Sequence, residues 1–421
     1  MKALIAGSGI GGMATALYLH RAVIDVEIFE RAEEVRELGV GINMLPHAVE
    51  ALTELGLLAD LDAAGIRTHE LIYANRFGQI VWQELRGTDA GYDYPQISIH
   101  RGKLLGLIHR AVVARLGIEA VHTGWQVDGF EQSADGVSVQ LSGRDGACKT
   151  ARGDLLIGAD GIHSAVRAQL YPDEGAPIWN GVMLWRGCTI WPQWRDGRTM
   201  AIAGGNFAKF VFYPIGTESG QPGMRLTNWA VMAKTGETGS APRRSENWSR
   251  PGVLADVLPF VRDRFSLDFV DPARIIEATG DFYEYPNCDR DPLSRWSFGA
   301  VTLLGDAAHP MYPVGSNGAS QAILDAKSLV GHLNSSASVE AALAAYDAER
   351  RPATAGIVLA NRQGGPEGVI DMIEARAPDG FSDIEAVASH EEREAVVRGY
   401  ARLAGFARNQ RLGSGGSTGR G

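Results

Sequence analysis

The sequence contains little cysteine and no long apolar run. Its 421 residues include three cysteines, Cys148, Cys188 and Cys288, which are far apart and form no Cys-x-x-Cys pair. This pattern argues against a disulfide framework and a structural zinc site, and it favours a reducing, cytoplasmic location. No run of about 18 apolar residues is present, so we expect no membrane span.

Basic runs and metal-binding spacings are missing as well. The formal net charge is −10 at pH 7, and the ten histidines include no His-x-x-x-His pair. Proteins that bind nucleic-acid phosphates usually carry a basic surface. The sequence therefore predicts no nucleic-acid partner and no metal centre.

Short apolar runs alternate with helical patterns along a chain that is long enough for two or three domains. The runs ALIAG at 3–7 and VEIF at 26–29 are typical of buried parallel strands. Further strands of this kind are predicted at 154–158 and 301–305. Helices are predicted at 11–21, 46–55, 103–115, 317–333 and 339–362, the last interrupted or kinked at Pro352.

The segment from about Trp179 to Tyr285 has a different composition. It is dense in aromatic residues and contains strand-like pieces such as KFVFYPI and RLTNWAVM. It predicts a largely antiparallel sheet inserted into an α/β domain that is built from separated segments. The final residues, GSGGSTGRG, contain nothing that would form a core, and they predict a flexible tail.

Three glycines near the N-terminus follow the spacing Gly-x-Gly-x-x-Gly, between a predicted strand and a predicted helix. Gly7 permits a tight turn, Gly9 lets a pyrophosphate approach the backbone, and Gly12 lets helix and strand pack closely. Glu30, at the end of the second strand, can bind the hydroxyls of an adenosine ribose. The alternative is a glycine-rich turn with a solvated Glu30. These residues alone do not separate NAD from FAD.

Two more acids stand where predicted strands end. Asp160 lies in GADGIHSAVR and Asp306 lies in GDAAHPMYPVGSNG. Ligands of parallel sheets bind at the carboxyl ends of the strands. The structural alternative for each acid is a helix N-cap.

The sequence resembles the class A flavoprotein monooxygenases, the group of p-hydroxybenzoate and salicylate hydroxylases. The three fingerprints of that family appear here in order, as GSGIGG with Glu30, GADGIHSAVR and GDAAHPMYPVGSNG. The resemblance extends to about Arg362. Within this family, GVGINMLPHAVEALTELGL, YPQISIHRG and YPNCDRDPL are most similar to the phenazine-modifying flavin hydroxylases of pyocyanin biosynthesis. The loop HPMYPVGSNG is nearer to the wider family.

The resemblance implies an α/β fold with a Rossmann-like FAD-binding domain of the glutathione-reductase type, an inserted β-rich substrate domain and C-terminal helices. The FAD-binding domain is expected at 1–70, 100–178 and 286–335. The substrate domain is expected at 71–99 and 179–285, the helical region at 336–412 and the tail at 413–421.

The resemblance also implies which residues bind FAD. Glu30 would hold the ribose, Arg101 would lie near the flavin phosphates and ribityl chain, and Asp306 would bond a ribityl hydroxyl. Val127 would make a backbone contact to adenine. The full expected set is Gly7, Gly9, Ile10, Gly12, Glu30, Gly41, Arg101, Val127, Asp160, Asp306, Gly315, Asn317, Gly318 and Ala319.

The loop after Asp306 contains two prolines, which restrict its backbone, followed by two glycines, which leave the backbone more freedom. Pro310 and Pro313 would fix the chain beside the flavin ring, whereas Gly315 and Gly318 would let backbone amides approach it. A helix that begins near Asn317 would then direct its positive end at the flavin.

Six residues are candidates for the substrate site. Trp185, Arg186, Phe212 and Tyr213 lie in the aromatic insertion, and Pro313 and Val314 lie on the flavin side. Arg186 could hold a carboxylate, although ordinary sheet packing is the alternative for these side chains. No catalytic base is assigned, because His309 could equally be structural.

The expected reaction follows from the resemblance. NADH or NADPH would reduce FAD, O2 would add to form a C4a-hydroperoxide, and an electron-rich carbon of a planar aromatic substrate would attack it. A phenazine-like substrate is expected, with or without a carboxylate. The alternatives are a salicylate-like or quinolone substrate, a flavin reductase or dehydrogenase, an NAD-dependent dehydrogenase, and a non-catalytic FAD-binding protein. The oligomeric state stays open.

Overall fold

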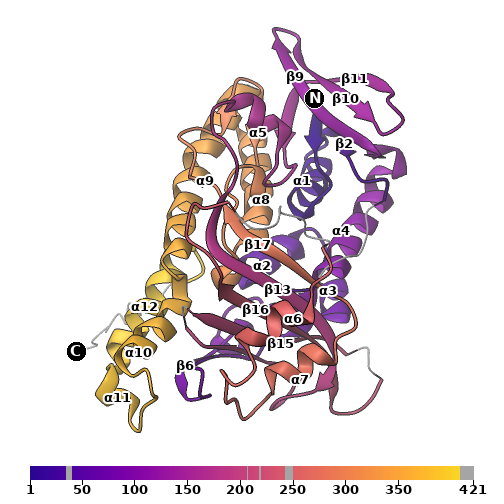
Figure 1. Ribbon diagram of the computed structural model, residues 1–421. Coiled ribbons are helices and arrows are strands. Elements are labelled where there is room, and N and C mark those ends of the chain that lie inside the picture. The colour runs from indigo at the N-terminus through magenta and orange to yellow at the C-terminus, as the bar shows by residue number, and fades with distance from the viewer. Residues whose placement is uncertain (35–39, 206, 218–219, 242–249, 408–421) are drawn as a thin grey trace, which may run out of the picture.

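The computed structural model describes residues 1–34, 40–205, 207–217, 220–241 and 250–407. The predicted tail at 413–421 lies outside these ranges. The described residues form a mixed α/β fold with two larger sheets and two smaller ones (Figure 1). The predicted fold class is confirmed.

The first large sheet has six strands in the order β18-β19-β12-β1-β2-β8. Its bounds are β18 (Ser297–Phe298), β19 (Val301–Leu303), β12 (Leu155–Gly158), β1 (Lys2–Ala6), β2 (Asp25–Glu30) and β8 (Val121–Thr123). All neighbours are parallel except β18 and β19. Because β19, β12 and β1 are adjacent, the three fingerprint loops that follow them lie at the same edge of the sheet.

Helices cover this sheet and bury its apolar side chains in one core. They are α1 (Ile10–Arg21), α2 (Pro46–Glu54), α3 (Leu58–Ala64), α4 (Arg101–Leu116), α5 (Ala165–Leu170), α8 (Gly318–Ser335) and α9 (Val339–Arg362). The predicted helices at 11–21, 46–55, 103–115, 317–333 and 339–362 match α1, α2, α4, α8 and α9. The predicted interruption does not occur, since α9 continues through Pro352.

The second large sheet has seven strands in the order β17-β13-β16-β15-β14-β5-β6. Its bounds are β17 (Phe282–Asp289), β13 (Ile178–Pro192), β16 (Met224–Lys234), β15 (Ala208–Gly216), β14 (Thr199–Ala203), β5 (Glu70–Ala74) and β6 (Ile80–Leu85). Its neighbours are antiparallel, except that β14 and β5 are parallel.

Each face of the seven-stranded sheet has its own apolar core. One face packs on the short helices α6 (Leu254–Val257) and α7 (Pro272–Glu277), which the sequence did not predict. The other face packs on α10 (Gly368–Arg376) and α12 (His390–Leu403). Successive side chains of a strand point to opposite faces of the sheet, so neighbouring residues enter different cores.

The two smaller sheets lie beside the large ones. The first contains β9 (Trp125–Ser133), β10 (Gly136–Gly143) and β11 (Cys148–Gly153), and the second contains β3 (Gly41–Met44), β7 (Ile97–His100) and β4 (Ile66–Arg67). Figure 1 shows β9–β11 at one end of the molecule and α10–α12 at the other, with α11 at Ile384–Val387. Within the described ranges, no helix is both long and apolar enough to cross a membrane.

Candidate active site

The glycine loop after β1 contains two positions where a side chain cannot fit and one that is open. At Gly7, where φ is +97°, an added Cβ would lie 2.5 Å from the Ala159 carbonyl oxygen. At Gly12 it would lie 2.1 Å from the Gly7 carbonyl oxygen, whereas at Gly9 it would meet nothing within 4 Å. Gly7 and Gly12 are therefore required by packing, and Gly9 leaves space in front of α1.

The N-terminus of α1 is suited to an anion. Its first turn contains no acidic residue, and no side chain of the described residues caps it. The N–H groups of such a helix end, together with the helix dipole, favour a phosphate. Ile10 begins this helix at the open side of Gly9, so the loop fits a pyrophosphate.

Glu30 is anchored rather than freely solvated. Its Oε2 accepts hydrogen bonds from the Ser8 backbone N–H at 2.9 Å and the Ser8 hydroxyl at 2.8 Å, and its Oε1 accepts from the Ala32 N–H at 2.9 Å. The carboxylate is thereby fixed beside the glycine loop, where the ribose of a dinucleotide lies in this fold. Val127 is buried in β9 opposite Leu141, and its contact to adenine stays a prediction.

Asp160 combines a helix-capping contact with an unused oxygen. Its Oδ2 accepts from the N–H groups of Ala165 at 2.8 Å and Val166 at 3.4 Å, near the start of α5. Its buried Oδ1 has no hydrogen-bond partner among the described residues, and burial raises the pKa of this carboxyl. The capping alternative is therefore real, yet one acceptor beside the Gly7 turn is left for a ligand.

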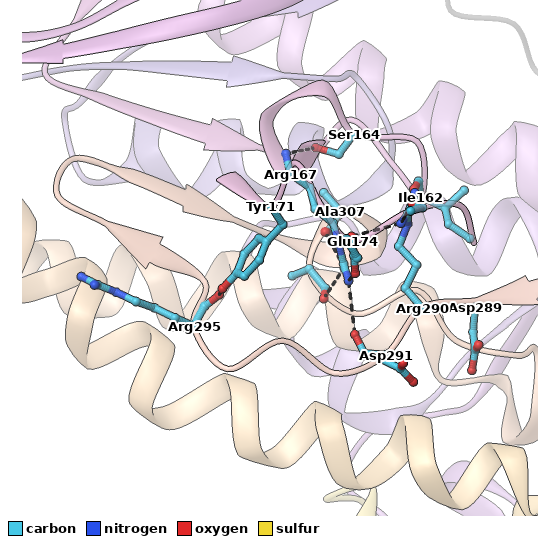
Figure 2. A network of polar contacts seen from close by, with 12 residues as sticks. Ile162, Ser164, Arg167, Tyr171, Glu174, Asp289, Arg290, Asp291, Arg295 and Ala307 are labelled. Carbon is cyan, nitrogen blue, oxygen red and sulfur yellow. Dashed lines mark hydrogen bonds and ion pairs between the residues drawn. The ribbon is translucent and has the colours of Figure 1, made fainter. Parts of the chain in front are cut away.

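A buried arginine ties the second fingerprint to the third (Figure 2). The guanidinium of Arg167, 1% exposed, donates to the carbonyl oxygens of Ala307 at 3.0 Å and Ala308 at 2.9 Å. The same side chain pairs with Glu174, which also accepts from Arg290 at 3.0 Å. The loop after Asp306 is thus fixed to the helix that follows Asp160.

Asp306 lies at the surface in a short 3-10 turn at Gly305–Ala307. Arg101 is the first residue of α4, and its backbone N–H donates to the Val40 carbonyl oxygen at 2.8 Å. Burial lowers the pKa of the Arg101 guanidinium, and the Asp306 carboxylate opposes that shift. The structure thus brings these two predicted cofactor residues close together, from positions about 200 residues apart in sequence.

His309 lies behind this loop in a buried ion network. Its Nε2 is 2.5 Å from Asp325 Oδ2, and Arg350 Nε donates to Asp325 Oδ1 at 2.8 Å. Asp325 also accepts from the Gly305 backbone N–H at 3.1 Å. Burial disfavours the Asp325 charge, but His309 and Arg350 outweigh it and lower the pKa of this carboxyl. These contacts favour the structural alternative for His309.

The loop at Gly315 is held by α12. Gly315 has φ +66°, and a Cβ there would lie 2.6 Å from the Tyr400 ring and hydroxyl. The fully buried Asn317 donates from Nδ2 to the Tyr400 hydroxyl at 2.9 Å. The sequence assigned the glycine to flavin approach, whereas packing against Tyr400 already requires it.

The neighbours of this loop differ in exposure. Val314 is buried and its carbonyl oxygen accepts from the Tyr400 hydroxyl at 3.3 Å, while Pro313 is exposed. A Cβ at Gly318 would come no closer than 3.9 Å to another atom. Ala319 follows in the first turn of α8, half-buried against the core.

Arg186 joins the inserted sheet to β3. Its Nη2 donates to the Gly41 carbonyl oxygen and its Nη1 to the Tyr285 hydroxyl at 3.3 Å. Gly41 in turn donates its N–H to Asn228 Oδ1 at 2.7 Å. Burial raises the pKa of the nearby Tyr213 hydroxyl to about 12, against the lowering effect of Arg186. Arg186 and Tyr213 face the predicted site, with the guanidinium already bonded to protein groups.

Trp185 and Phe212 do not join them. Alternation along the strands turns both into the core on the opposite face of the sheet. Trp185 stacks on Phe260 at 5.5 Å and Phe212 contacts Phe269 at 5.8 Å between ring centroids. The structure thus places these two side chains away from the face that carries Arg186 and Tyr213, where sheet packing accounts for them.

A narrow cavity of about 30 Å³ lies on the site face of the sheet. It is lined by Tyr73, Met200 and Ile202 of the sheet, by Gly315 and Ser316 of the loop, and by Tyr400 and Phe406 of the C-terminal region. Glu84, Arg86 and Gln96 supply its polar wall. The sequence analysis missed these sheet and C-terminal residues because none lies in a motif.

The geometry described so far agrees with the comparison to known proteins. Residues 1–180 and 286–360 match the family of the FAD binding domain. The chain is 44% identical to the phenazine 1,6-dicarboxylic acid hydroxylase of Lysobacter antibioticus over 363 residues, 85% of this chain and 88% of that protein. It belongs to the FAD-dependent aromatic hydroxylases.

Other hydroxylases of this family are more distant. The aurachin C monooxygenase/isomerase of Stigmatella aurantiaca is 36% identical over 83% of this chain and 85% of its own length. A 3-hydroxybenzoate 6-hydroxylase of Aquipseudomonas alcaligenes is 30% identical over 85% of this chain and 87% of its own length. The predicted family is confirmed, and this hydroxylase uses FAD with NAD(P)H and O2.

Solved structures agree on the fold. The HpxO protein of Klebsiella pneumoniae, solved with FAD and uric acid, superposes with a TM-score of 0.73 at 23% identity. The match covers 96% of each chain. The open Gly9 side, the anchored Glu30 and the unused Asp160 oxygen fit the cofactor of this family.

Proposed function

We propose that this enzyme hydroxylates a phenazine carboxylate, consuming NADH or NADPH and O2. The observation that carries the proposal is the 44% identity to phenazine 1,6-dicarboxylic acid hydroxylase over most of both chains. The cavity supports it, because aromatic and aliphatic side chains line it and one arginine reaches its wall. A planar aromatic acid needs such a lining.

The proposal assigns the cofactor to the residues predicted from the sequence. The chemistry that bound FAD would supply is its own reduction by NAD(P)H and the subsequent activation of O2. The N-terminus of α1 would bind the pyrophosphate beside Gly9, and Glu30 would bind the ribose. Asp306 would bind the ribityl chain of FAD, and Arg101 would bind the ribityl chain and the phosphates. The division into a cofactor part and a β-rich substrate part, at the predicted boundaries, belongs to this proposal.

The apolar lining of the cavity has a role in the reaction. Tyr73, Met200 and Ile202 are all at most 4% exposed, so they would keep water from the reacting ring. Exclusion of water prevents loss of the activated oxygen as hydrogen peroxide. A cytoplasmic location is also proposed, supported by the low cysteine content of three in 421 residues.

The test is NAD(P)H consumption under air by the purified, FAD-loaded protein. Phenazine-1-carboxylate, its N-methyl form and phenazine-1,6-dicarboxylate would be added singly, and products followed by mass. We expect strong stimulation and a product that has gained oxygen or exchanged a carboxyl for a hydroxyl. NAD(P)H oxidation matched only by hydrogen peroxide would refute these substrates, and a protein unable to take up FAD would refute the enzyme.

A quinolone substrate is the second candidate. The observation that favours it is the 36% identity to the aurachin C monooxygenase/isomerase. A quinolone in the same assay separates the two candidates, because the better substrate gives the larger ratio of product to hydrogen peroxide.

A further inference from the structure

The polar wall of the cavity contains an arginine whose donors are only partly used. Arg86 Nε donates to Gln96 Oε1 at 2.8 Å, and Nη1 pairs with Glu84 Oε1. Its Nη2 makes no hydrogen bond to any of the described residues. Since a guanidinium offers five N–H donors, both N–H groups of Nη2 are available to a ligand in the cavity.

A tyrosine hydroxyl beside Arg86 is also unpaired within the described part of the chain. Tyr73 is 2% exposed, and its hydroxyl makes no hydrogen bond there. Burial raises the pKa of this phenol and Glu84 adds to the effect, whereas Arg86 lowers it. Tyr73 therefore lies within the electrostatic reach of both charges and stays protonated, so its O–H can donate.

Glu84 keeps the arginine in place. Its Oε2 accepts from the Trp82 indole N–H at 3.3 Å, while Oε1 holds Arg86. The Arg86 side chain is 15% exposed and that of Glu84 is 23% exposed. An arginine so far removed from water needs a partner, and one carboxylate leaves part of the planar donor fork free.

The same cavity is lined by Gly315 and Ser316 of the loop that follows the third fingerprint. A flat molecule that occupied the cavity would therefore contact both this loop and the polar wall. The Phe406 ring lies 6.0 Å from the Arg86 guanidinium and stacks on His47 at 5.8 Å. Because 30 Å³ holds about one water, an aromatic substrate could enter only if lining side chains such as Phe406 made room for it.

We propose that Arg86 determines specificity by binding a carboxylate on the substrate ring, with the Tyr73 hydroxyl as a second donor. The proposal rests on the proposed function and deepens it, since it assigns the acid group of the substrate to a side chain. A charge-assisted bond of this kind is shorter and stronger than a neutral one. A ring with two carboxylates could thus present one to the reacting centre while Arg86 holds the other.

The experiment uses the full-length, FAD-loaded protein and measures dissociation constants from changes in flavin absorbance. The ligands are phenazine-1,6-dicarboxylate, phenazine-1-carboxylate and unsubstituted phenazine, with 2-naphthoate and its amide as a second acid and neutral pair. We expect Arg86→Gln to weaken binding of the acids about tenfold or more. Binding of phenazine and the amide should change less than twofold.

Two further variants separate recognition from folding. Arg198→Gln is the matched control, because Arg198 is ion-paired with Asp89 at 2.7 Å and does not line the cavity; it should leave every constant unchanged. Glu84→Gln keeps an acceptor for Trp82 but releases Arg86, so the acids should bind several-fold tighter. If the Glu84–Arg86 pair only stabilises the fold, Glu84→Gln should instead weaken the binding of the acids.

The outcomes are distinct for the two proposals. If Arg86→Gln binds acids and neutral rings as the unmodified protein does, Arg86 recognition is overturned while the hydroxylase assignment stands. If the unmodified protein binds the neutral rings more tightly than the acids, Arg86 recognition is likewise overturned while the hydroxylase assignment stands. If none of these rings binds and none stimulates NAD(P)H oxidation, both proposals fail.

Discussion

The nucleotide side and the substrate side of this enzyme are built in different ways. Beside the six-stranded sheet, backbone geometry dominates: Gly7 and Gly12 are fixed by contacts of 2.5 and 2.1 Å to carbonyl oxygens. Beside the seven-stranded sheet, side chains from β5, β6, β14 and α12 converge on one cavity. The first arrangement suits the FAD that this family binds, and the second can change with the substrate.

The difference also shows in what holds each side. The loop of the third fingerprint is locked by two buried ions, because Arg167 of α5 donates to its Ala307 carbonyl oxygen and Asp325 accepts from its Gly305 N–H. The cavity loop at Gly315 is held by neutral hydrogen bonds of Tyr400 and Asn317 and by one longer contact to an ion, since the Gly315 N–H donates at 3.5 Å to Glu367, which pairs with Lys209. Removing one member of a buried ion pair costs more than removing a neutral bond, so the two sides should respond differently to substitution.

Gly12→Ala should have the largest effect. A Cβ 2.1 Å from the Gly7 carbonyl oxygen forces α1 away from β1, and we expect little folded, yellow protein. Gly9→Ala is the comparison, since its Cβ meets nothing within 4 Å. It should fold with a free energy of unfolding within about 1 kcal/mol of the original but bind FAD about tenfold more weakly, as measured by flavin release. Equal effects of the two variants would contradict the packing argument.

Asp325→Asn tests the buried ions beneath the cofactor loop. We expect a loss of about 3–5 kcal/mol in the free energy of unfolding, because His309 and Arg350 would lose their shared counter-ion. Denaturant unfolding of the FAD-free protein measures this. The control is Asp62→Asn, which breaks a surface pair with Arg67 and should cost about 0–1 kcal/mol. A loss below 1 kcal/mol at Asp325 would show that the network is dispensable.

Tyr400→Phe tests the neutral contacts on the cavity side. The hydroxyl bonds Asn317, Asn361 and the Val314 carbonyl oxygen, so we expect a cost of about 1–3 kcal/mol. FAD affinity should stay within twofold, while the KM for the aromatic substrate rises several-fold. A loss of FAD with unchanged substrate KM would refute the separation of the two sides.

His47→Gln gives the smallest expected effect, visible only through pH. Burial, with a contribution from Arg350, lowers the pKa of His47 to about 4. The unfolded chain, with an ordinary value near 6.5, therefore binds more protons between these limits, and stability falls as pH drops from about 6.5 towards 4. By pH 5, this fall should be smaller in the variant by about 1–2 kcal/mol. Parallel curves of unfolding free energy against pH would contradict the shift.

The sequence predicted the cofactor side well because its determinants are local. The spacing of Gly7, Gly9 and Gly12 sets the turn between β1 and α1. The strand that ends at Glu30 is β2, which directly follows α1 in the chain. The family was predicted from the resemblance of all three fingerprints, and both the family and the fold class are confirmed. The roles of single cofactor residues and the domain boundaries stay predictions.

The cavity side was predicted poorly because face and partner depend on tertiary contacts. Trp185 and Arg186 are adjacent in sequence, yet the pleat sends one to each face of the sheet. The aromatic composition of the insertion predicted a sheet without telling which aromatic rings face the flavin side. Gly315 was assigned to the cofactor, while its contact with Tyr400, 85 residues later, was not foreseeable.

The sequence by itself determined the nucleotide loop and the order of the three fingerprints, since each depends on residue types at short fixed spacing. The enzyme class followed from the resemblance of these fingerprints to a known family. Only the tertiary structure decided that Arg167 and Asp325 lock the fingerprint loops, that Arg86 reaches the cavity and that α12 closes it. The bond to Asp325 joins residues 20 positions apart, and the bond from Arg167 to Ala307 joins residues 140 positions apart. Their formation follows from the packing of whole sheets and helices, which no local pattern specifies.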